Sequence, residues 1–342
     1  MFISAIRDWG RRYFSTPVVT ILITIALIAF AGMDRGPYLI VNTIVTAGML
    51  IMVSMGLALV FGVMNIAQFA HGEYFMIGTL VAYFVITPLQ NYVNLHPSDT
   101  LTLIAPLIAI GAAIIAGGIA GALTELLIFS ELRRRNRSNW VMNSFLVTVG
   151  VSVLLINAHQ LLFGTDFKGI VRYWSGPTLK FMQLFISRDR AMVLIISAVV
   201  VTIFWAFMKY SRTGQAIRAV SQDEAGALSV GINLNGIQVL TMSMACSLSS
   251  AAGASLLFIY PSYPTVGLEP LYMSWFVVIL AGLGNIMGAA VCAFIVAFLK
   301  VATVEYIGTG WDFVVPTGLI MLMLVIKPNG IFGTAVRGVL DE

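Results

Sequence analysis

Ten apolar runs, separated by short polar stretches, account for most of the chain. A helix needs about 20 apolar residues to cross the roughly 30 Å hydrocarbon layer of a bilayer, and most of these runs approach or exceed that length. They cover residues 17–33, 39–61, 74–90, 101–129, 139–163, 191–208, 236–260, 271–284, 285–306 and 312–327. The pattern predicts an all-α polytopic membrane protein of about ten transmembrane helices, in which residues 1–342 form a single transmembrane domain.

Composition and charge support a membrane protein. Hydrophobic residues make up 59% of the chain and charged residues 10%, against about 25% charged residues in an ordinary globular domain. Cys246 and Cys292 lie in apolar runs without metal-ligand or redox spacing, so no metal site is expected. The net charge of +4 would suit a nucleic acid, but the basic residues flank apolar runs, where they orient a membrane protein. We therefore expect no nucleic-acid partner.

The basic residues fall into three clusters beside the apolar runs. The clusters are Arg7, Arg11 and Arg12 before the first run, Arg133, Arg134, Arg135 and Arg137 after the fourth, and Lys209, Arg212 and Arg218 after the sixth. Positively charged loops stay in the cytoplasm, so a cytoplasmic N-terminus places all three clusters inside, and ten crossings return the C-terminus there. The connection 164–190 is predicted to lie outside although it is basic, because longer loops are translocated with little regard to their charge.

Two segments inside this pattern do not suit a plain helix: residues 62–73, GVMNIAQFAHGE, and residues 282–288, GLGNIMG. Both contain the spacing G-x-x-N-I and follow a run that crosses from outside to inside, which predicts equivalent points in two internal repeats. Non-helical backbone at membrane depth is tolerated only where protein or a water-filled cavity satisfies its polar groups. We therefore expect broken helices near the substrate route, with a simple kink at 62–73 as the alternative.

Polar residues in the two breaks are the candidates for the substrate route: Asn65, Gln68, His71, Glu73 and Asn285. Ionisable residues inside a membrane are costly to bury, which makes them functional candidates by default. For His71 and Glu73 the alternative is a helix N-terminal cap, where a carboxylate meets free N–H groups. For the three amides the alternative is hydrogen bonding between packed helices.

Three further ionisable residues lie within the apolar runs. Glu125 lies about two turns before the arginine cluster at 133–137, so we expect it to pair with that cluster or to reach the membrane interface. His159 and Glu305 lie near outer ends of predicted spans and are expected to be interfacial.

A polar island at residues 209–235 lies between two long apolar runs. Its sequence, KYSRTGQAIRAVSQDEAGALSVGINLN, is too rich in small residues for a membrane span and too helix-like for an ordinary loop. We expect it to bind a soluble partner in the cytoplasm, a motor subunit that powers transport. The chain has no G-x-x-x-x-G-K-[ST] loop for nucleotide phosphates, no H-E-x-x-H zinc pair and no G-x-S-x-G nucleophile. The prediction is therefore a transport subunit without enzymatic activity.

Four stretches of the sequence carry a family resemblance. They are GLALVFGVMNIAQFAHGEYFMIG at 56–78, YSRTGQAIRAVSQDEAGALSVGIN at 210–233, and LAGLGNIMGA at 280–289 followed by KPNGIFG at 327–333. From about residue 42 to residue 333 the chain resembles the membrane permeases of ATP-binding-cassette importers for branched-chain amino acids, in a group that also contains ribose-type and urea permeases. The string FAHGE resembles the amino acid and urea branch rather than the sugar branch.

The resemblance implies that the polar island is a coupling segment that docks on an ATPase subunit. The residues expected to take part are Gly214, Arg218, Asp223, Glu224, Ala225, Gly226, Ala227 and Gly231. The usual pattern in such importers is E-A-A-x-x-x-G, and this chain departs from it. Counting back from Gly231, the three positions hold Ala225, Gly226 and Ala227, with Glu224 one place too early, so the role of Glu224 is open.

The resemblance also implies an assembly in a bacterial inner membrane. We expect a second permease subunit, two ATPase subunits that bind the ATP and Mg absent from this chain, and a soluble periplasmic or extracellular substrate-binding protein, all among membrane lipids. The expected cargo is a branched-chain or other neutral amino acid, moved into the cytoplasm. The alternatives are urea or a short amide and, in a different class, a self-sufficient secondary transporter or channel that would use Glu73 as its ion-coupling carboxylate.

Overall fold

The computed structural model describes residues 24–26, 28–32, 34, 36–96, 98–135, 140–174, 176, 178–181 and 184–333. Most of the predicted first span, residues 17–33, lies outside these residues, as do Arg7, Arg11, Arg12 and Arg137. Both chain ends, whose cytoplasmic position is predicted, also lie outside the described residues.

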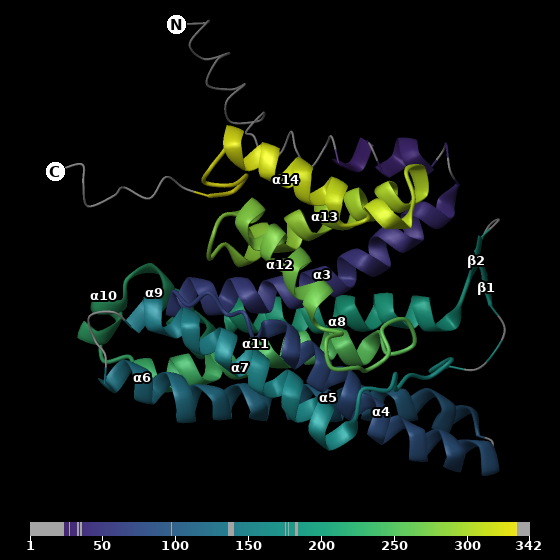
Figure 1. The fold of residues 1–342 in the computed structure, drawn as a ribbon, viewed down its shortest axis with the longest axis horizontal. Coiled ribbons are helices and arrows are strands. Elements are labelled where there is room, and N and C mark those ends of the chain that lie inside the picture. Colours follow the sequence, from purple (N-terminus) through teal and green to yellow (C-terminus); the bar gives the residue numbers. More distant parts are fainter. Residues whose placement is uncertain are drawn as a thin grey trace, which may run out of the picture.

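Helices make up most of the described chain (Figure 1). They are α3 (Pro37–Met64), α4 (His71–Leu95), α5 (Asp99–Thr124), α6 (Ser130–Arg135), α7 (Trp140–Phe163), α8 (Arg188–Tyr210), α9 (Arg212–Gln222), α10 (Glu224–Ser229), α11 (Leu234–Ser255), α12 (Leu268–Ala281), α13 (Ile286–Tyr306) and α14 (Val314–Ile326). A π-helical stretch, η1 (Glu125–Phe129), joins α5 to α6, and a 3-10 turn, η2 (Thr309–Trp311), precedes α14. The prediction of an all-α protein is confirmed.

The described residues contain one small sheet, which the sequence pattern did not predict. Strands β1 (Leu179–Phe181) and β2 (Leu184–Ile186) pair antiparallel, with Leu179 opposite Ile186. The hairpin belongs to the connection 164–190 and lies at one end of the helical bundle (Figure 1).

Eight helical segments of the described chain are long and apolar enough to cross a membrane. They are Pro37–Met64, His71–Leu95, Asp99–Arg135, Met142–Phe163, Arg188–Tyr210, Leu234–Ser255, Ile286–Tyr306 and Thr309–Ile326, and they match eight of the ten predicted runs. The polytopic prediction is therefore confirmed. The predicted run 271–284 corresponds to α12, which has 14 residues. At roughly 21 Å this helix is too short to cross the hydrocarbon layer by itself.

Helices α3 and α11 form the centre of the bundle. Helix α3 packs against α13, α11, α12 and α8, while α11 packs against α5, α4 and α3. A helix that is apolar all round hides its surface by being enclosed rather than by turning one face inward, and α3 is buried along most of its length. Helices α7 and α14 keep most of their apolar side chains exposed, as expected of helices that face lipid.

Small residues let the central helices approach closely. A Cβ at Gly78 of α4 would lie 2.2 Å from the backbone oxygen of Ser250 in α11, and one at Gly253 would lie 2.2 Å from the backbone oxygen of Phe75. The Ser250 hydroxyl also donates to the backbone oxygen of Tyr74 at 2.7 Å. Close packing and such hydrogen bonds are the main source of helix association in a membrane, where lipid tails are as apolar as leucine.

The polar segments gather at the two ends of the bundle. In Figure 1, α9 and α10 of the polar island lie at the same end as α6, which carries the arginine cluster. The hairpin of the connection 164–190 and the C-terminal end of α4 lie at the opposite end. This arrangement agrees with the prediction that the two basic regions face one side and the connection 164–190 the other.

Side-chain hydrogen bonds hold the connection 164–190 against the bundle. Asp189, in the first turn of α8, accepts from the backbone N–H groups of Tyr173 and Trp174 at 2.9 Å each. The Tyr173 hydroxyl donates to the backbone oxygen of Ala254, at the end of α11, at 2.6 Å. This part of the connection is therefore a fixed surface over the ends of α8 and α11.

The close approach of α4 and α11 can be tested with Gly78→Ala. The new methyl group would overlap the backbone of Ser250, so we expect the free energy of unfolding in detergent to fall by roughly 1–3 kcal/mol, the usual cost of overpacking. The matched control is Gly111→Ala in α5, where a Cβ would meet nothing within 4 Å. Equal stability of the two variants would contradict the packing.

Candidate functional site

The first break is a re-entrant segment and not a kink. Helix α3 ends at Met64, Asn65 takes a left-handed conformation with φ 52°, and α4 begins only at His71. The His71 Nε2 atom lies 3.0 Å from the backbone oxygen of Val53. Val53 precedes the end of α3 by eleven residues, a distance of roughly 16 Å along the helix. The chain therefore turns back beside the last three turns of α3 before α4 starts.

The re-entrant segment, residues 65–70, is largely enclosed by protein. Ile66, Gln68 and Ala70 are buried. The Thr148 hydroxyl of α7 donates to the backbone oxygen of Ala67 at 3.1 Å, so a neighbouring helix replaces a hydrogen bond that an α-helix would have made internally. This covers one of the backbone groups that must be satisfied where the chain is not helical at membrane depth.

Gln68 and His71 make contacts between helices. The Gln68 amide nitrogen donates to the Met242 sulfur at 3.2 Å and lies 4.0 Å from the Cys246 sulfur, both in α11. The backbone oxygen of His71 accepts from the Ser249 hydroxyl of α11 at 3.0 Å. Among the described residues, the Gln68 Oε1 and His71 Nδ1 atoms have no hydrogen-bond partner. The two side chains thus join α3, α4 and α11 and retain unused polar atoms.

Glu73 is the carboxylate of the first break. It is 2% exposed, and its Oε1 atom accepts from the Ser152 hydroxyl of α7 at 2.6 Å. Within the described chain its Oε2 atom has no partner. Glu73 lies in the first turn of α4, as the capping alternative requires, but Ala70 is the N-cap and no side chain caps the helix. The carboxylate is directed to α7 instead.

Aromatic side chains join the first break to α7 and α12. Phe69 packs edge-on to Phe145 of α7, with ring centroids 5.1 Å apart, and stacks on Trp275 of α12 at 5.3 Å. Such pairs favour these geometries. The Trp275 indole nitrogen has no hydrogen-bond partner among the described residues.

The second break is a tight turn between α12 and α13. Gly282 and Gly284 have φ values of 94° and 81°, a region that favours glycine. Asn285 caps α13, since its Oδ1 atom accepts from the Gly288 N–H at 2.8 Å and its Nδ2 atom donates to the Phe332 oxygen at 3.2 Å. The matched asparagines of the two breaks therefore differ, because Asn65 ends a helix whereas Asn285 begins one.

The two breaks touch one another. A Cβ at Gly62, near the end of α3, would lie 3.1 Å from the Cα atom of Gly284. At the other end of α12, a Cβ at Gly72 would lie 2.4 Å from the backbone oxygen of Gly267, the residue before α12. The short helix α12 therefore lies between the start of α4 and the end of α3, in contact with both ends of the re-entrant region.

Glu269 and Lys300 form an ion pair that the sequence interpretation missed. Glu269 lies in the first turn of α12 and Lys300 in α13, and the Lys300 side chain is 11% exposed. The available signal was Lys300 itself, because a lysine inside a predicted span is a functional candidate by default. The pair ties the start of α12 to α13.

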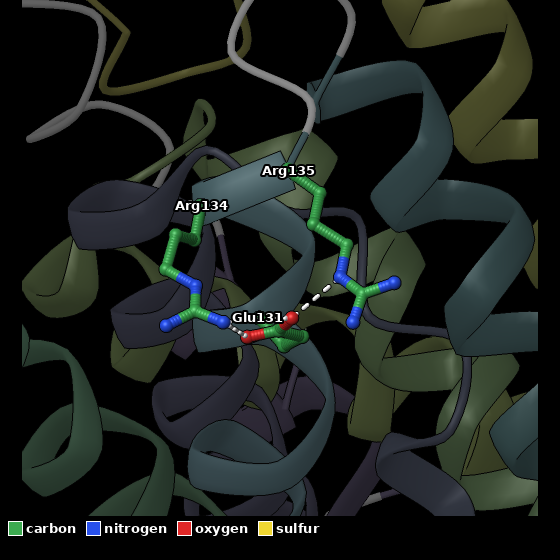
Figure 2. Close-up of polar contacts among 3 residues, drawn as sticks. All are labelled: Glu131, Arg134 and Arg135. Atoms are coloured by element: carbon green, nitrogen blue, oxygen red, sulfur yellow. Dashed lines mark hydrogen bonds and ion pairs between the residues drawn. The ribbon is translucent and has the colours of Figure 1, made fainter.

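Glu125 pairs with Arg133, as one of its two predicted alternatives requires. The carboxylate is buried at the start of the π-helical stretch η1, and Arg133 reaches it from α6. Six residues further along, Glu131 is half-buried and pairs with Arg134 and Arg135 at 3.0 and 2.5 Å (Figure 2). The arginine cluster is thus partly neutralised by two glutamates of its own helix.

The predicted coupling segment folds as two short helices. Ser211 caps α9 by accepting from the Gly214 N–H at 2.8 Å, and Gly231 ends the region with φ 85°. Gly214 and Ala227 are buried, Gly226 is half-buried, and Arg218, Asp223, Glu224, Ala225 and Gly231 are exposed. Ala227, 4% exposed, belongs to the hydrophobic core. The buried residues hold α9 and α10 to the bundle, while the exposed ones form an outer surface.

One cavity joins the coupling segment to the second break. We call it the basic groove; its volume is about 670 Å³ and it is lined by Met55, Phe204, Trp205, Met208, Lys209, Arg218, Ser221, Gln222, Gly284, Asn285, Ile286 and Met287. Asn285 and Arg218 of the coupling segment therefore line the same cavity. The other four residues predicted for the substrate route, Asn65, Gln68, His71 and Glu73, belong to the first break.

Comparison with known proteins finds relatives along most of the chain. The family model described as branched-chain amino acid transport system, permease component, matches residues 39–325. The high-affinity branched-chain amino acid transport system permease protein LivH of Salmonella typhimurium is 26% identical over 287 residues, which is 82% of this chain and 90% of that protein. The corresponding permease protein BraD of Pseudomonas aeruginosa is 27% identical over 299 residues, covering 86% and 94%. No solved structure shows a significant match.

The Glu269–Lys300 pair can be tested with a double-mutant cycle of Glu269→Gln and Lys300→Met. Lys300 is largely removed from solvent, so we expect a coupling free energy of roughly 1–3 kcal/mol, between the values for exposed and buried pairs. The control cycle is Glu131→Gln with Arg135→Met, where the arginine side chain is 76% exposed (Figure 2), with about 0.3–0.5 kcal/mol expected. Unfolding in detergent measures both cycles. Equal coupling in the two would contradict a structural role for Lys300.

Proposed function

The chain belongs to the family of permease components of branched-chain amino acid transport systems, and we propose that it is the membrane subunit of an ATP-binding-cassette importer. It is a multi-pass membrane transport subunit rather than an enzyme. The cargo we propose is a branched-chain or other neutral amino acid, moved into the cytoplasm by the energy of ATP that partner subunits hydrolyse. The family match over residues 39–325 carries this proposal.

The surface proposed to meet the ATPase lies on α10 and the turn that follows it. Leu228 is 54% exposed and Val230 is 77% exposed, within an otherwise polar segment. Asp223, Glu224 and Ala225 are exposed beside them. An apolar patch with a charged rim is typical of a protein interface. Gly214 and Ala227 take part by packing the segment against the bundle, so a movement of the partner passes to the helices.

The proposed orientation follows from this surface. The end of the bundle with α9, α10 and α6 faces the cytoplasm, and the end with the β1–β2 hairpin faces outward (Figure 1). Both chain ends are then cytoplasmic, in a bacterial inner membrane. The connection 164–190, held by Asp189, is available to a soluble substrate-binding protein. A second permease subunit and two ATPase subunits complete the proposed assembly.

The proposed substrate route passes the two breaks. Asn65, Gln68, His71 and Glu73 line or support its first part, and Asn285 its second. Support comes from the unused polar atoms of Gln68, His71 and Glu73 and from the contact between the breaks at Gly62 and Gly284. Amides suit a neutral cargo because they offer hydrogen bonds without the full desolvation cost of a charge. Urea or a short amide is the second candidate cargo, since the same groups would serve it.

The assembly is tested by purifying the tagged chain from its native membrane in mild detergent and identifying each subunit that accompanies it. We expect an ATPase with a G-x-x-x-x-G-K-[ST] loop, a second permease and a soluble binding protein, whose bound ligand would identify the cargo. Recovery of the chain alone, active for uptake without ATP, would overturn the proposal in favour of a secondary transporter.

The docking surface is tested with Leu228→Glu. A carboxylate buried without a partner in the interface is expected to lower ATP-driven uptake in proteoliposomes by at least about tenfold. The fold should be kept because Leu228 is exposed. The matched control is Leu95→Glu, 78% exposed at the end of α4, which should retain uptake. Normal uptake and ATPase stimulation by Leu228→Glu would refute the assignment.

Glu73→Gln separates an importer driven by ATP from a secondary transporter. The amide oxygen can still accept from Ser152, so we expect the variant to fold and its uptake to fall by less than about tenfold. Uptake should depend on ATP and be independent of proton and sodium gradients in both proteins. Gradient-dependent uptake that the substitution abolishes would instead identify Glu73 as an ion-coupling carboxylate.

A further inference from the structure

The basic groove lies where the coupling segment, the end of α8 and the second break meet. We infer that it binds the phosphate headgroup of an anionic phospholipid, with an acyl chain extending along α8. The inference rests on the charges, the apolar wall and the position of the groove, and it is independent of the proposed cargo and of the ATPase.

Two uncompensated cations line the groove. Lys209 and Arg218 make no ion pair with a carboxylate among the described residues, and no acidic side chain lines the groove in that part of the chain. One Arg218 nitrogen donates to the Lys209 backbone oxygen at 3.4 Å, which holds the guanidinium near the residue that carries the other cation. Two cations in one groove, with no anion of their own, suit a phosphate.

Neutral groups of the groove complete a headgroup site. Ser221 and Gln222 line it together with the cations and offer hydrogen bonds to phosphate or glycerol oxygens. The Lys209 ammonium lies 4.6 Å from the Trp205 ring centroid and 5.2 Å from that of Tyr210. Tryptophan and tyrosine are enriched at the level of lipid headgroups, so this end of the groove lies where a headgroup would be.

The rest of the wall is apolar and continues into a membrane-spanning helix. Met287 of α13 is 53% exposed and lines it with the half-buried Trp205 and Ile286, over a floor made by the buried Phe204 and Met208. A free phosphate or a nucleotide would leave this wall without a partner, whereas an acyl chain would cover it. The combination of a basic end and an apolar wall therefore selects an amphiphile with an anionic headgroup.

A lipid in the basic groove would touch both the coupling segment and the second break. Arg218 belongs to α9, and Gly284 and Asn285 belong to the break. Gly284 in turn contacts Gly62 of the first break. The lipid would thus lie between the coupling segment and the region where the two breaks meet, in contact with both.

The test uses the full-length chain, purified without nucleotide or cargo in a neutral detergent, and native mass spectrometry of added phosphatidylglycerol. The wild-type chain should retain phosphatidylglycerol in preference to phosphatidylcholine. Each basic residue near an anionic headgroup contributes about fivefold in affinity, so the double variant Lys209→Gln with Arg218→Gln should bind the first phosphatidylglycerol about 30-fold more weakly. The variant Lys209→Arg with Arg218→Lys keeps both charges and should bind like the wild type.

The matched control is Arg134→Gln with Arg135→Gln. It removes the same charge from an exposed helix, α6, at the same end of the bundle (Figures 1 and 2), and should leave binding unchanged. An equal loss in this control, or equal retention of the two lipids by the wild type, would overturn the inference. Displacement of phosphatidylglycerol by inorganic phosphate would do so too, because it indicates a simple anion site. Unchanged phosphatidylglycerol binding by the variant Lys209→Gln with Arg218→Gln would overturn the inference as well.

Discussion

Backbone hydrogen bonding without water is the constraint on which the rest of this structure depends. Where α3 stops at Met64, the chain leaves the helix inside the bundle, and neighbouring side chains must replace the hydrogen bonds that are lost. Thr148 does this for the re-entrant segment and Asn285 for the start of α13. The contacts that satisfy the breaks therefore also hold the surrounding helices in place. The same set of contacts packs the bundle and lines the proposed route.

Close contacts at glycine residues connect the two breaks to each other and to α12. The backbones at Gly62 and Gly284 meet without intervening side chains, and the start of α12 meets α4 at Gly72. Close-packed backbone cannot absorb a displacement in the way that long side chains can. The basic groove is lined by residues of both α9 and the second break, and Gly284 of that break contacts Gly62 near the end of α3. The proposed coupling segment and the proposed route are thus a few contacts apart.

The apolar runs predicted eight of the spans because length and hydropathy are properties of a single segment. The position of the first break was predicted from its polar residues, and the pairing of Glu125 was one of two predicted alternatives. The course of residues 65–70 was left open between a break and a kink, and the Glu269–Lys300 pair was missed, because each depends on residues far apart in the sequence. The predicted run 271–284 was already 14 residues long, like α12, but was counted as a span. Burial of Ala227 was also missed, because small residues suit an exposed docking surface and a tight internal contact equally well.

The length of α12 has a consequence for how the protein enters the membrane. A helix of 14 residues is too short to be released from the insertion machinery into lipid as a span of its own. It carries Glu269 at its start, whose charge is matched only when Lys300 of the following helix is present. We therefore expect α12 to be retained until α13 has been synthesised. Biogenesis of this permease is thus expected to proceed by insertion of a helical pair, with the re-entrant region completed late in translation.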